Sequence, residues 1–176
     1  YDLLLQRDGH ELLYFPALGY SHGDFEAMRE MLEHPGTVLG LGDGGAHCGV
    51  LCDASLPTYM LTHWVRDRTR GPRFTLEHAV ALQTRRTAEL YGYLDRGLVA
   101  PGYRADLNVV DLDALALAAP EMVYDLPAGG RRLVQRATGY AATITAGVPV
   151  RVDDEPTGDR PGSLVRGTRP DPATGH

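Results

Sequence analysis

Two side chains that can exchange protons, Asp43 and His47, lie four residues apart in the sequence. They follow a short apolar run, Val38 to Leu41, of the kind that forms a strand buried on both faces. The residues around the aspartate permit positive φ and close approach of a ligand to the backbone, because they are Gly42, Gly44 and Gly45. Parallel α/β proteins place catalytic groups at the C-terminal tips of such strands. The alternative is a tight turn in which Asp43 accepts hydrogen bonds from the backbone.

The elements that must position Asp43 come before it in the chain. Glu11–Phe15 reads as a strand that Pro16 closes, and Asp24 is placed to cap a helix that stops at Pro35. With a second strand at Thr37–Leu41, residues 11–43 predict a strand, a helix and a strand. That order implies one βαβ unit with a parallel sheet.

Helices and then strands are expected after Asp43. One helix is predicted over residues 58–68, and a second begins at Thr75 as N-cap and ends at Gly92. After Gly92 the sequence becomes rich in turns and strands. Residues 142–145 and 148–150 predict a hairpin around Ala146-Gly147. Residues 153–176 read as an extended tail, because they are rich in Pro, Gly, Asp and Arg.

Composition excludes several classes of protein. The net charge is −6, 43% of residues are hydrophobic, and basic residues do not alternate with aromatic ones, so nucleic-acid binding is not expected. No apolar run approaches the length of a membrane span. Cys48 and Cys52 have no metal or redox spacing and are expected to be free thiols in a reducing, cytoplasmic compartment. The chain opens at Tyr1 as if a helix were already under way, which predicts a piece of a longer protein.

Two parts of the sequence resemble one superfamily. Asp95-Arg96-Gly97, with Ala100-Pro101-Gly102 and Ala105-Asp106-Leu107 after it, resembles the segment at which metal-dependent amidohydrolases leave the catalytic barrel and enter a small β-sandwich. Dihydropyrimidinase, dihydroorotase and urease-like relatives share that segment. A narrower resemblance, to N-acyl-D-amino-acid deacylases (D-aminoacylases), is carried by Leu39–His47, Asp125–Leu133 and Thr157–Arg166.

The resemblance implies an α/β fold that contains the C-terminal part of a (β/α)8 metal-dependent hydrolase barrel, followed by part of a β-sandwich. Residues 1–94 would hold the last βα units and their C-terminal helices, 95–152 the sandwich portion and 153–176 the tail. Such barrels need about 250 residues, so the earlier strands would lie upstream of this chain. Asp106 would be a structural residue of the junction. We expect Arg131 and Arg132 to be surface ion-pair partners.

The resemblance also implies the chemistry. Asp43 would shuttle a proton from water activated by zinc to the leaving amine, as a weak or shared metal ligand, with the main ligands upstream. His47, Gly44 and Gly45 would touch the substrate or orient Asp43. The small-molecule substrate would be a linear amide, an N-acyl-D-amino acid. Cys48 and Cys52 do not match the metal-binding cysteine of the family.

Other functions remain open at this point. The chain alone is expected neither to bind zinc tightly nor to turn over substrate. The alternatives are another amidohydrolase, such as a cyclic amidase or a deaminase, and a non-catalytic remnant or assembly module. The sequence does not determine the acyl group, the amino-acid preference, the number of metals or the oligomeric state.

Overall fold

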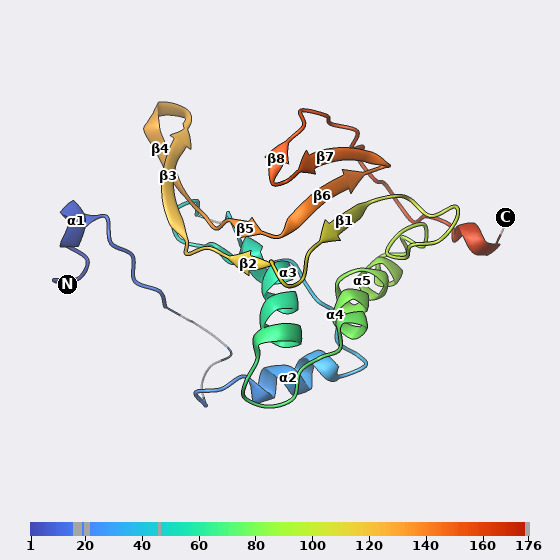
Figure 1. Ribbon diagram of the computed structural model, residues 1–176, viewed down its shortest axis with the longest axis horizontal. Helices are drawn as coiled ribbons and strands as arrows, with labels where there is room; N and C mark the ends of the chain where they lie inside the picture. Colours follow the sequence, from blue (N-terminus) through green and yellow to red (C-terminus); the bar gives the residue numbers. More distant parts are fainter. Residues whose placement is uncertain (16–18, 20–21, 46, 175–176) are drawn as a thin grey trace. The chain divides into compact units, whose positions relative to one another are not determined.

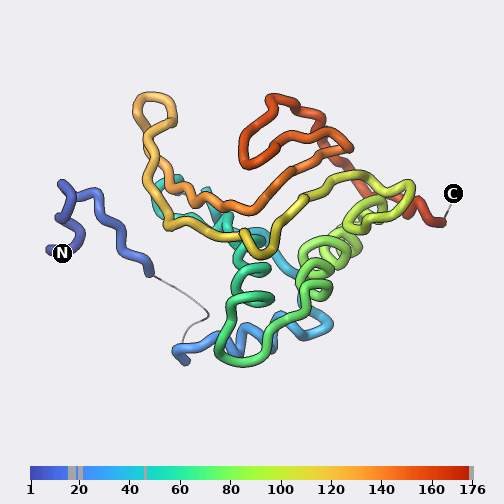
Figure 2. The backbone as a smooth tube through the Cα atoms, viewed as in Figure 1, coloured from blue at the N-terminus to red at the C-terminus, as the bar shows by residue number. Residues whose placement is uncertain are grey.

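A computed structural model describes residues 1–15, 19, 22–45 and 47–174 (Figures 1 and 2). The chain divides into two compact units, Tyr1–Thr37 and Val38–His176. Helices and small antiparallel sheets make up the described residues, and no closed barrel is present among them. Within the same residues, every helix is too short or too polar to cross a bilayer.

The first unit contains two helices, α1 (Gln6–Gly9) and α2 (Glu26–Glu33). Asp24 helps to start α2, because its carboxylate accepts a 3.1 Å hydrogen bond from the amide of Glu26. The helix expected to be under way at Tyr1 does not form, since residues 2–5 form turns and α1 itself contains left-handed Arg7 and Asp8.

Neither strand of the predicted βαβ unit forms. Glu11–Phe15 and Thr37–Leu41 have no strand assignment, and Phe15 and Leu41 are 83% and 99% exposed. The physical reason is that a parallel strand needs a neighbour to pair its N–H and C=O groups, and neither segment is paired with any described strand. Pro16, predicted to close the first strand, lies outside the described residues.

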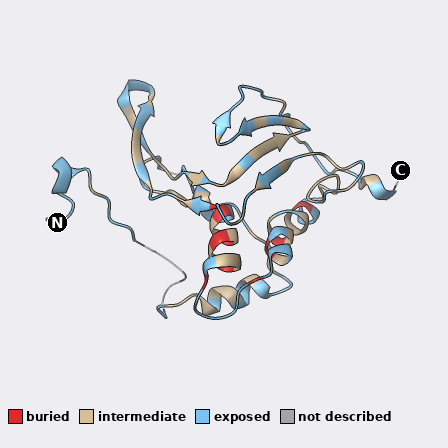
Figure 3. Ribbon diagram, in the orientation of Figure 1, coloured by how far each residue is buried: buried red, intermediate tan, exposed pale blue. Residues whose placement is uncertain are grey.

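Most of the core of the second unit lies on the helices between Asp53 and Leu90 (Figure 3). They are η1 (Asp53–Ser55), α3 (Leu56–Tyr59), η2 (Met60–Asp67), α4 (Leu76–Gln83) and α5 (Arg85–Leu90). Helix η2 is a π-helix that ends with a 2.9 Å bond from the Arg68 amide to the His63 carbonyl. The buried apolar side chains are Met60, Trp64, Phe74, Ala79, Leu82, Ala88 and Leu115.

The two predicted helices are confirmed with one difference. Thr75 caps α4 by accepting a 3.2 Å bond from the amide of His78, as expected. The second helix is interrupted at Thr84, where φ is −124° and ψ is −87°. The hydroxyl of Thr84 bonds to the carbonyl of Val80 at 2.7 Å, which gives the backbone an alternative to continuing the helix. Gly92, with φ +70°, lies just beyond the end of α5.

Three antiparallel sheets follow. The largest has the order β1-β6-β7-β8, from β1 (Leu107–Val110), β6 (Tyr140–Thr145), β7 (Val148–Val152) and β8 (Glu155–Pro156). Ala146 and Gly147 both have positive φ between β6 and β7, as a type I′ hairpin turn requires, so the predicted hairpin is confirmed. The other pairs are β2 (Ala116–Leu117) with β5 (Ala137–Thr138), and β3 (Glu121–Leu126) with β4 (Gly130–Val134) across η3 (Pro127–Gly129).

The tail after β8 is extended, as predicted, apart from the short helix η4 (Pro172–Thr174). It returns to the end of α5, where the amide of Arg169 donates a 2.8 Å bond to the carbonyl of Gly92. Where Cβ of an alanine at position 92 would lie, the Thr168 side chain already comes within 2.6 Å. The glycine is therefore required for the close approach of the tail.

Candidate active-site loop

Asp43 lies on a loop that packs tightly against η1. A Cβ added at Gly42 would come within 2.5 Å of the Asp53 carbonyl oxygen, and one added at Gly44 would come within 2.6 Å of the Ala54 Cβ. Real Cβ atoms do not come this close to other atoms. The two glycines on either side of Asp43 therefore let the loop lie against Asp53 and Ala54, which fixes the backbone on both sides of the carboxylate.

The carboxylate of Asp43 has no partner among the residues that the structure describes. The residue is exposed, and within the described ranges its side chain makes no hydrogen bond and no ion pair. Among the described residues no backbone amide donates to the Asp43 carboxylate, in contrast to Asp24 and Asp111, whose carboxylates accept such bonds. An exposed carboxylate without such a partner, on a loop whose backbone is fixed, can accept a proton from a ligand and give it back.

His47 lies on the other side of a sharp turn. Gly45 has φ +90°, and His47 and Cys48 have φ +53° and +50°. Positive φ is uncommon for residues other than glycine and costs energy that the surroundings must offset. The His47 side chain is exposed, and no hydrogen bond joins it to Asp43. The structure thus places Asp43, Gly44, Gly45 and His47 on one loop without bringing the two proton-exchanging groups into contact.

The β3–β4 hairpin holds the far end of this loop. The amide of Leu133 donates a 2.9 Å bond to the carbonyl of Cys48. The side chains of Met122 and Arg131 lie 3.6 and 3.7 Å from where a Cβ on Gly49 would be. Sequence reasoning did not find this contact, because nothing local in either segment signals the other.

Arg131 and Arg132, both predicted as ion-pair partners, differ in the structure. Arg132 makes two hydrogen bonds to Asp125, of 2.8 and 2.6 Å, and this guanidinium holds the pKa of the Asp125 carboxyl below its ordinary value. For Arg131 no acidic partner lies among the described residues. The prediction is confirmed for Arg132 and wrong for Arg131 in the part of the chain that the structure describes.

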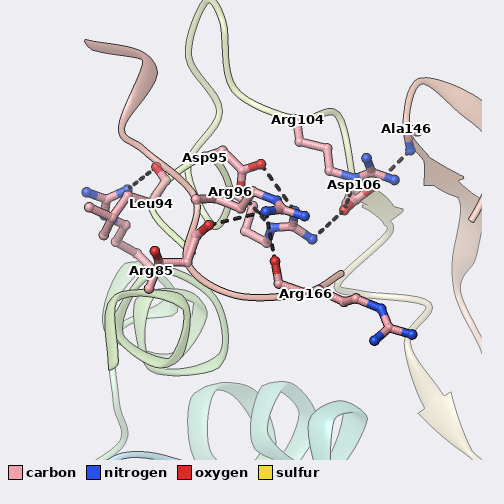
Figure 4. A network of polar contacts seen from close by, with 10 residues as sticks. Arg85, Leu94, Asp95, Arg96, Arg104, Asp106, Ala146 and Arg166 are labelled. Atoms are coloured by element: carbon pink, nitrogen blue, oxygen red, sulfur yellow. Dashed lines mark hydrogen bonds and ion pairs between the residues drawn. The ribbon is translucent and has the colours of Figure 1, made fainter. Parts of the chain in front are cut away.

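A network of charges surrounds the junction between α5 and β1 (Figure 4). Arg96 donates a 2.8 Å bond to Asp95 and lies 3.6 Å from the Asp106 carboxylate. Asp106 also accepts bonds from Arg104 and from the amide of Ala146, each at 2.8 Å. The hydrogen bonds from Arg96 hold the pKa of Asp95 below its ordinary value. Each carboxylate here is already occupied, as expected for groups with a structural role.

The described residues do not by themselves fit a zinc ion. Zinc sites in proteins use at least three protein ligands, and no three His, Cys, Asp or Glu side chains converge in the described part of the chain. Cys48 and Cys52 are free thiols, as predicted. Asp43 belongs to no such group among these residues.

These features define a mixed helix-and-sheet protein with an exposed carboxylate on a glycine-braced loop. The chain belongs to the amidohydrolase family, because the model of that family matches residues 10–151. The matched range includes Asp43, His47 and the whole β3–β4 hairpin. Comparisons with curated proteins and with solved structures give no match. Family membership indicates a hydrolase acting on a small molecule, in a family whose members are typically metal-dependent.

Proposed function

We propose that this chain is part of an enzyme that hydrolyses a linear amide, an N-acyl-D-amino acid, to a D-amino acid and a carboxylate. The observation that carries the proposal is the free, exposed carboxylate of Asp43 on its braced loop, inside the range that matches the amidohydrolase family. The choice of substrate is supported by the resemblance of Leu39–His47, Asp125–Leu133 and Thr157–Arg166 to D-aminoacylases.

Asp43 would act as the proton-transfer group. In amide hydrolysis a water molecule attacks the carbonyl carbon, the C–N bond breaks, and the nitrogen leaves as an amine that must gain a proton. One carboxylate can take the proton from the attacking water and return it to the amine. Asp43 suits this role because no cation of the described chain competes for its oxygens. The exposed His47 on the same loop is proposed to contact the substrate or to orient Asp43.

The proposal keeps zinc as the metal of the full-length protein, with its main ligands outside the described residues. When bound, zinc polarises the amide carbonyl and makes water a stronger nucleophile. The proposed division is into barrel units at 1–94, a sandwich portion at 95–152 and a tail at 153–176. The two free thiols support a reducing, cytoplasmic location.

A substrate panel tests the proposal. The full-length protein would be purified with zinc and assayed on N-acetyl-D-amino acids, their L-isomers, hydantoins and aminated heterocycles. Release of D-amino acid with little activity on the other classes is the expected result. Faster turnover of hydantoins or heterocycles would favour a cyclic amidase or a deaminase. Absence of any turnover, together with absence of zinc binding, would favour an assembly module.

A further inference from the structure

The β3–β4 hairpin brings the guanidinium group of Arg131 to the loop that carries Asp43 and His47. The Nε atom of Arg131 lies 3.7 Å from where a Cβ on Gly49 would be, two residues beyond His47. Figure 1 shows β3 and β4 as two strands of one hairpin, and Arg131 is a residue of β4.

The loop and the hairpin are fixed to each other. The backbone bond from Leu133 to Cys48 is 2.9 Å long, and Met122 of the opposite strand lies against Gly49 beside Arg131. Arg131 itself lies in β4 opposite the register irregularity between Val123 and Leu126, so the backbone bond at Leu133 and the contact of Met122, and not its own pairing, hold this part of the hairpin at Gly49. Arg131 therefore stays close to the Asp43 loop whenever this hairpin contact is made.

The neighbouring arginines of the hairpin are already neutralised. Arg132 makes a two-point contact with Asp125, and Arg136 donates a 2.9 Å bond to Glu121. Arg131 is exposed, and in the described ranges it has no carboxylate partner. The one unneutralised guanidinium of these three is the one beside Gly49.

We propose that Arg131 binds the carboxylate of the substrate and thereby selects N-acyl amino acids over uncharged amides, an inference that rests on the proposed function. A guanidinium presents parallel N–H groups that match the two oxygens of a carboxylate. An N-acyl amino acid carries such a carboxylate one carbon away from the amide nitrogen. Arg131 would hold the carboxylate from the hairpin, and the Asp43 loop, which contacts that hairpin at Cys48 and Gly49, would face the amide. Arg131 is a specificity residue in this account and takes no part in proton transfer.

The test compares two substrates and three variants of the full-length protein. The substrates are an N-acetyl-D-amino acid and its carboxamide, which lacks the negative charge. Arg131→Gln is expected to raise KM for the acid by roughly 10- to 100-fold, the loss of a hydrogen-bonded ion pair, and to leave KM for the carboxamide and both kcat values unchanged. Arg131→Lys keeps the positive charge but loses the paired N–H groups of the guanidinium. Its KM for the acid is therefore expected to lie between those of the wild type and Arg131→Gln.

Arg136→Gln is the matched control, because it removes one charge of the same hairpin without touching the Gly49 loop. It is expected to leave both KM values at the wild-type level. An unchanged KM for the acid in Arg131→Gln would overturn the inference, and so would an equal loss on both substrates, which indicates a structural role. If the wild-type protein hydrolyses neither substrate, the proposed function fails first, and the inference fails with it.

Discussion

The hydroxyl of Tyr103 donates a 2.6 Å hydrogen bond to the carboxylate of Asp171, which joins the C-terminal tail to the segment that leads into β1. The amide of Ala173 donates a second bond to the same carboxylate, at 2.9 Å. The backbone of Arg169 is bonded on both sides, to Gly92 at 2.8 Å and to Leu94 at 3.1 Å. The tail is therefore part of the structure around the end of α5 and not a loose extension.

The Tyr103–Asp171 bond predicts a dependence of stability on pH. Its hydrogen bond is the main cause that holds the pKa of Asp171 below the ordinary 3.8, and the same bond raises the pKa of Tyr103 above the ordinary 10.0. The contribution of Asp171 is present above pH 3.8 and is lost as pH falls through its lower folded pKa. The contribution of Tyr103 is present below pH 10.0 and is lost as pH rises through its higher folded pKa.

Asp171→Asn is expected to reduce the loss of stability at low pH and the loss at high pH. The measurement is the urea midpoint of the full-length protein as a function of pH, for the wild type and the variant. The difference between the two proteins should be largest between pH 3.8 and pH 10.0 and should shrink as the pH falls further, where the carboxylate of the wild type takes up a proton. A difference that stays constant over the whole range would show that Asp171 does not act through its charge.

Close packing of the tail on Gly92 gives a second prediction. Gly92→Ala would place a Cβ against Thr168 and would force a side chain into left-handed backbone. The left-handed conformation alone costs an L-residue roughly 1–2 kcal/mol, so the free energy of unfolding should fall by at least that amount. Gly162→Ala in the same tail has open space and no positive φ, and urea denaturation should show little change for it. Equal effects of the two substitutions would contradict the tail packing described above.

The helix core predicts a cost for removing Leu82. This side chain is 1% exposed on α4, whereas Val80 on the same helix is 42% exposed. Leu82→Ala should lower the free energy of unfolding by about 2–5 kcal/mol, through lost burial and the cavity left behind. Val80→Ala should cost well under half of that, because its side chain is already in contact with water. Thermal denaturation of both variants measures the difference, and a reversed order would show that α4 packs on its other face.

The features that sequence predicted correctly are local ones. The Thr75 cap depends on a bond to an amide three residues away, and the β6–β7 hairpin depends on the backbone of Ala146 and Gly147. The predicted strands at Glu11–Phe15 and Thr37–Leu41 are apolar enough, but a strand also needs a partner, and the described residues supply none. The local sequence pattern indicates which secondary structure a segment favours, but it does not show whether a partner strand is present.

The candidate site divides in the same way. Asp43 and its glycines stand out in the sequence by type and spacing. The sequence does not show why glycine is needed at positions 42 and 44. The reason is that Asp53 and Ala54 come too close to these positions for a side chain to fit. The contact between Leu133 and Cys48 joins segments far apart in the chain, and only the structure distinguishes Arg131 from its paired neighbours Arg132 and Arg136.

Packing of the Asp43 loop on η1 predicts that Gly44 matters for activity. Gly44→Ala would push the loop away from Ala54 and move the carboxylate. A misplacement of about 1 Å can cost roughly 100-fold in rate, so kcat/KM should fall by up to that factor. Gly40→Ala, where a Cβ meets nothing within 4 Å, should retain wild-type activity. Steady-state kinetics of the two variants on the preferred substrate provide the comparison, and full activity of Gly44→Ala would mean that the loop position is not critical.

The most direct test of the central claim is the kcat of Asp43→Asn on the N-acyl-D-amino acid that the wild-type protein hydrolyses fastest. The variant keeps the size of the side chain and removes its ability to accept a proton. Since proton transfer by a positioned side chain contributes roughly 10²- to 10⁴-fold, kcat should fall by that factor. Asp159→Asn, an exposed carboxylate of the tail, should retain full activity with the same urea midpoint. Wild-type kcat in Asp43→Asn would contradict the account, because the amide would then be cleaved without the carboxylate assigned to move its proton.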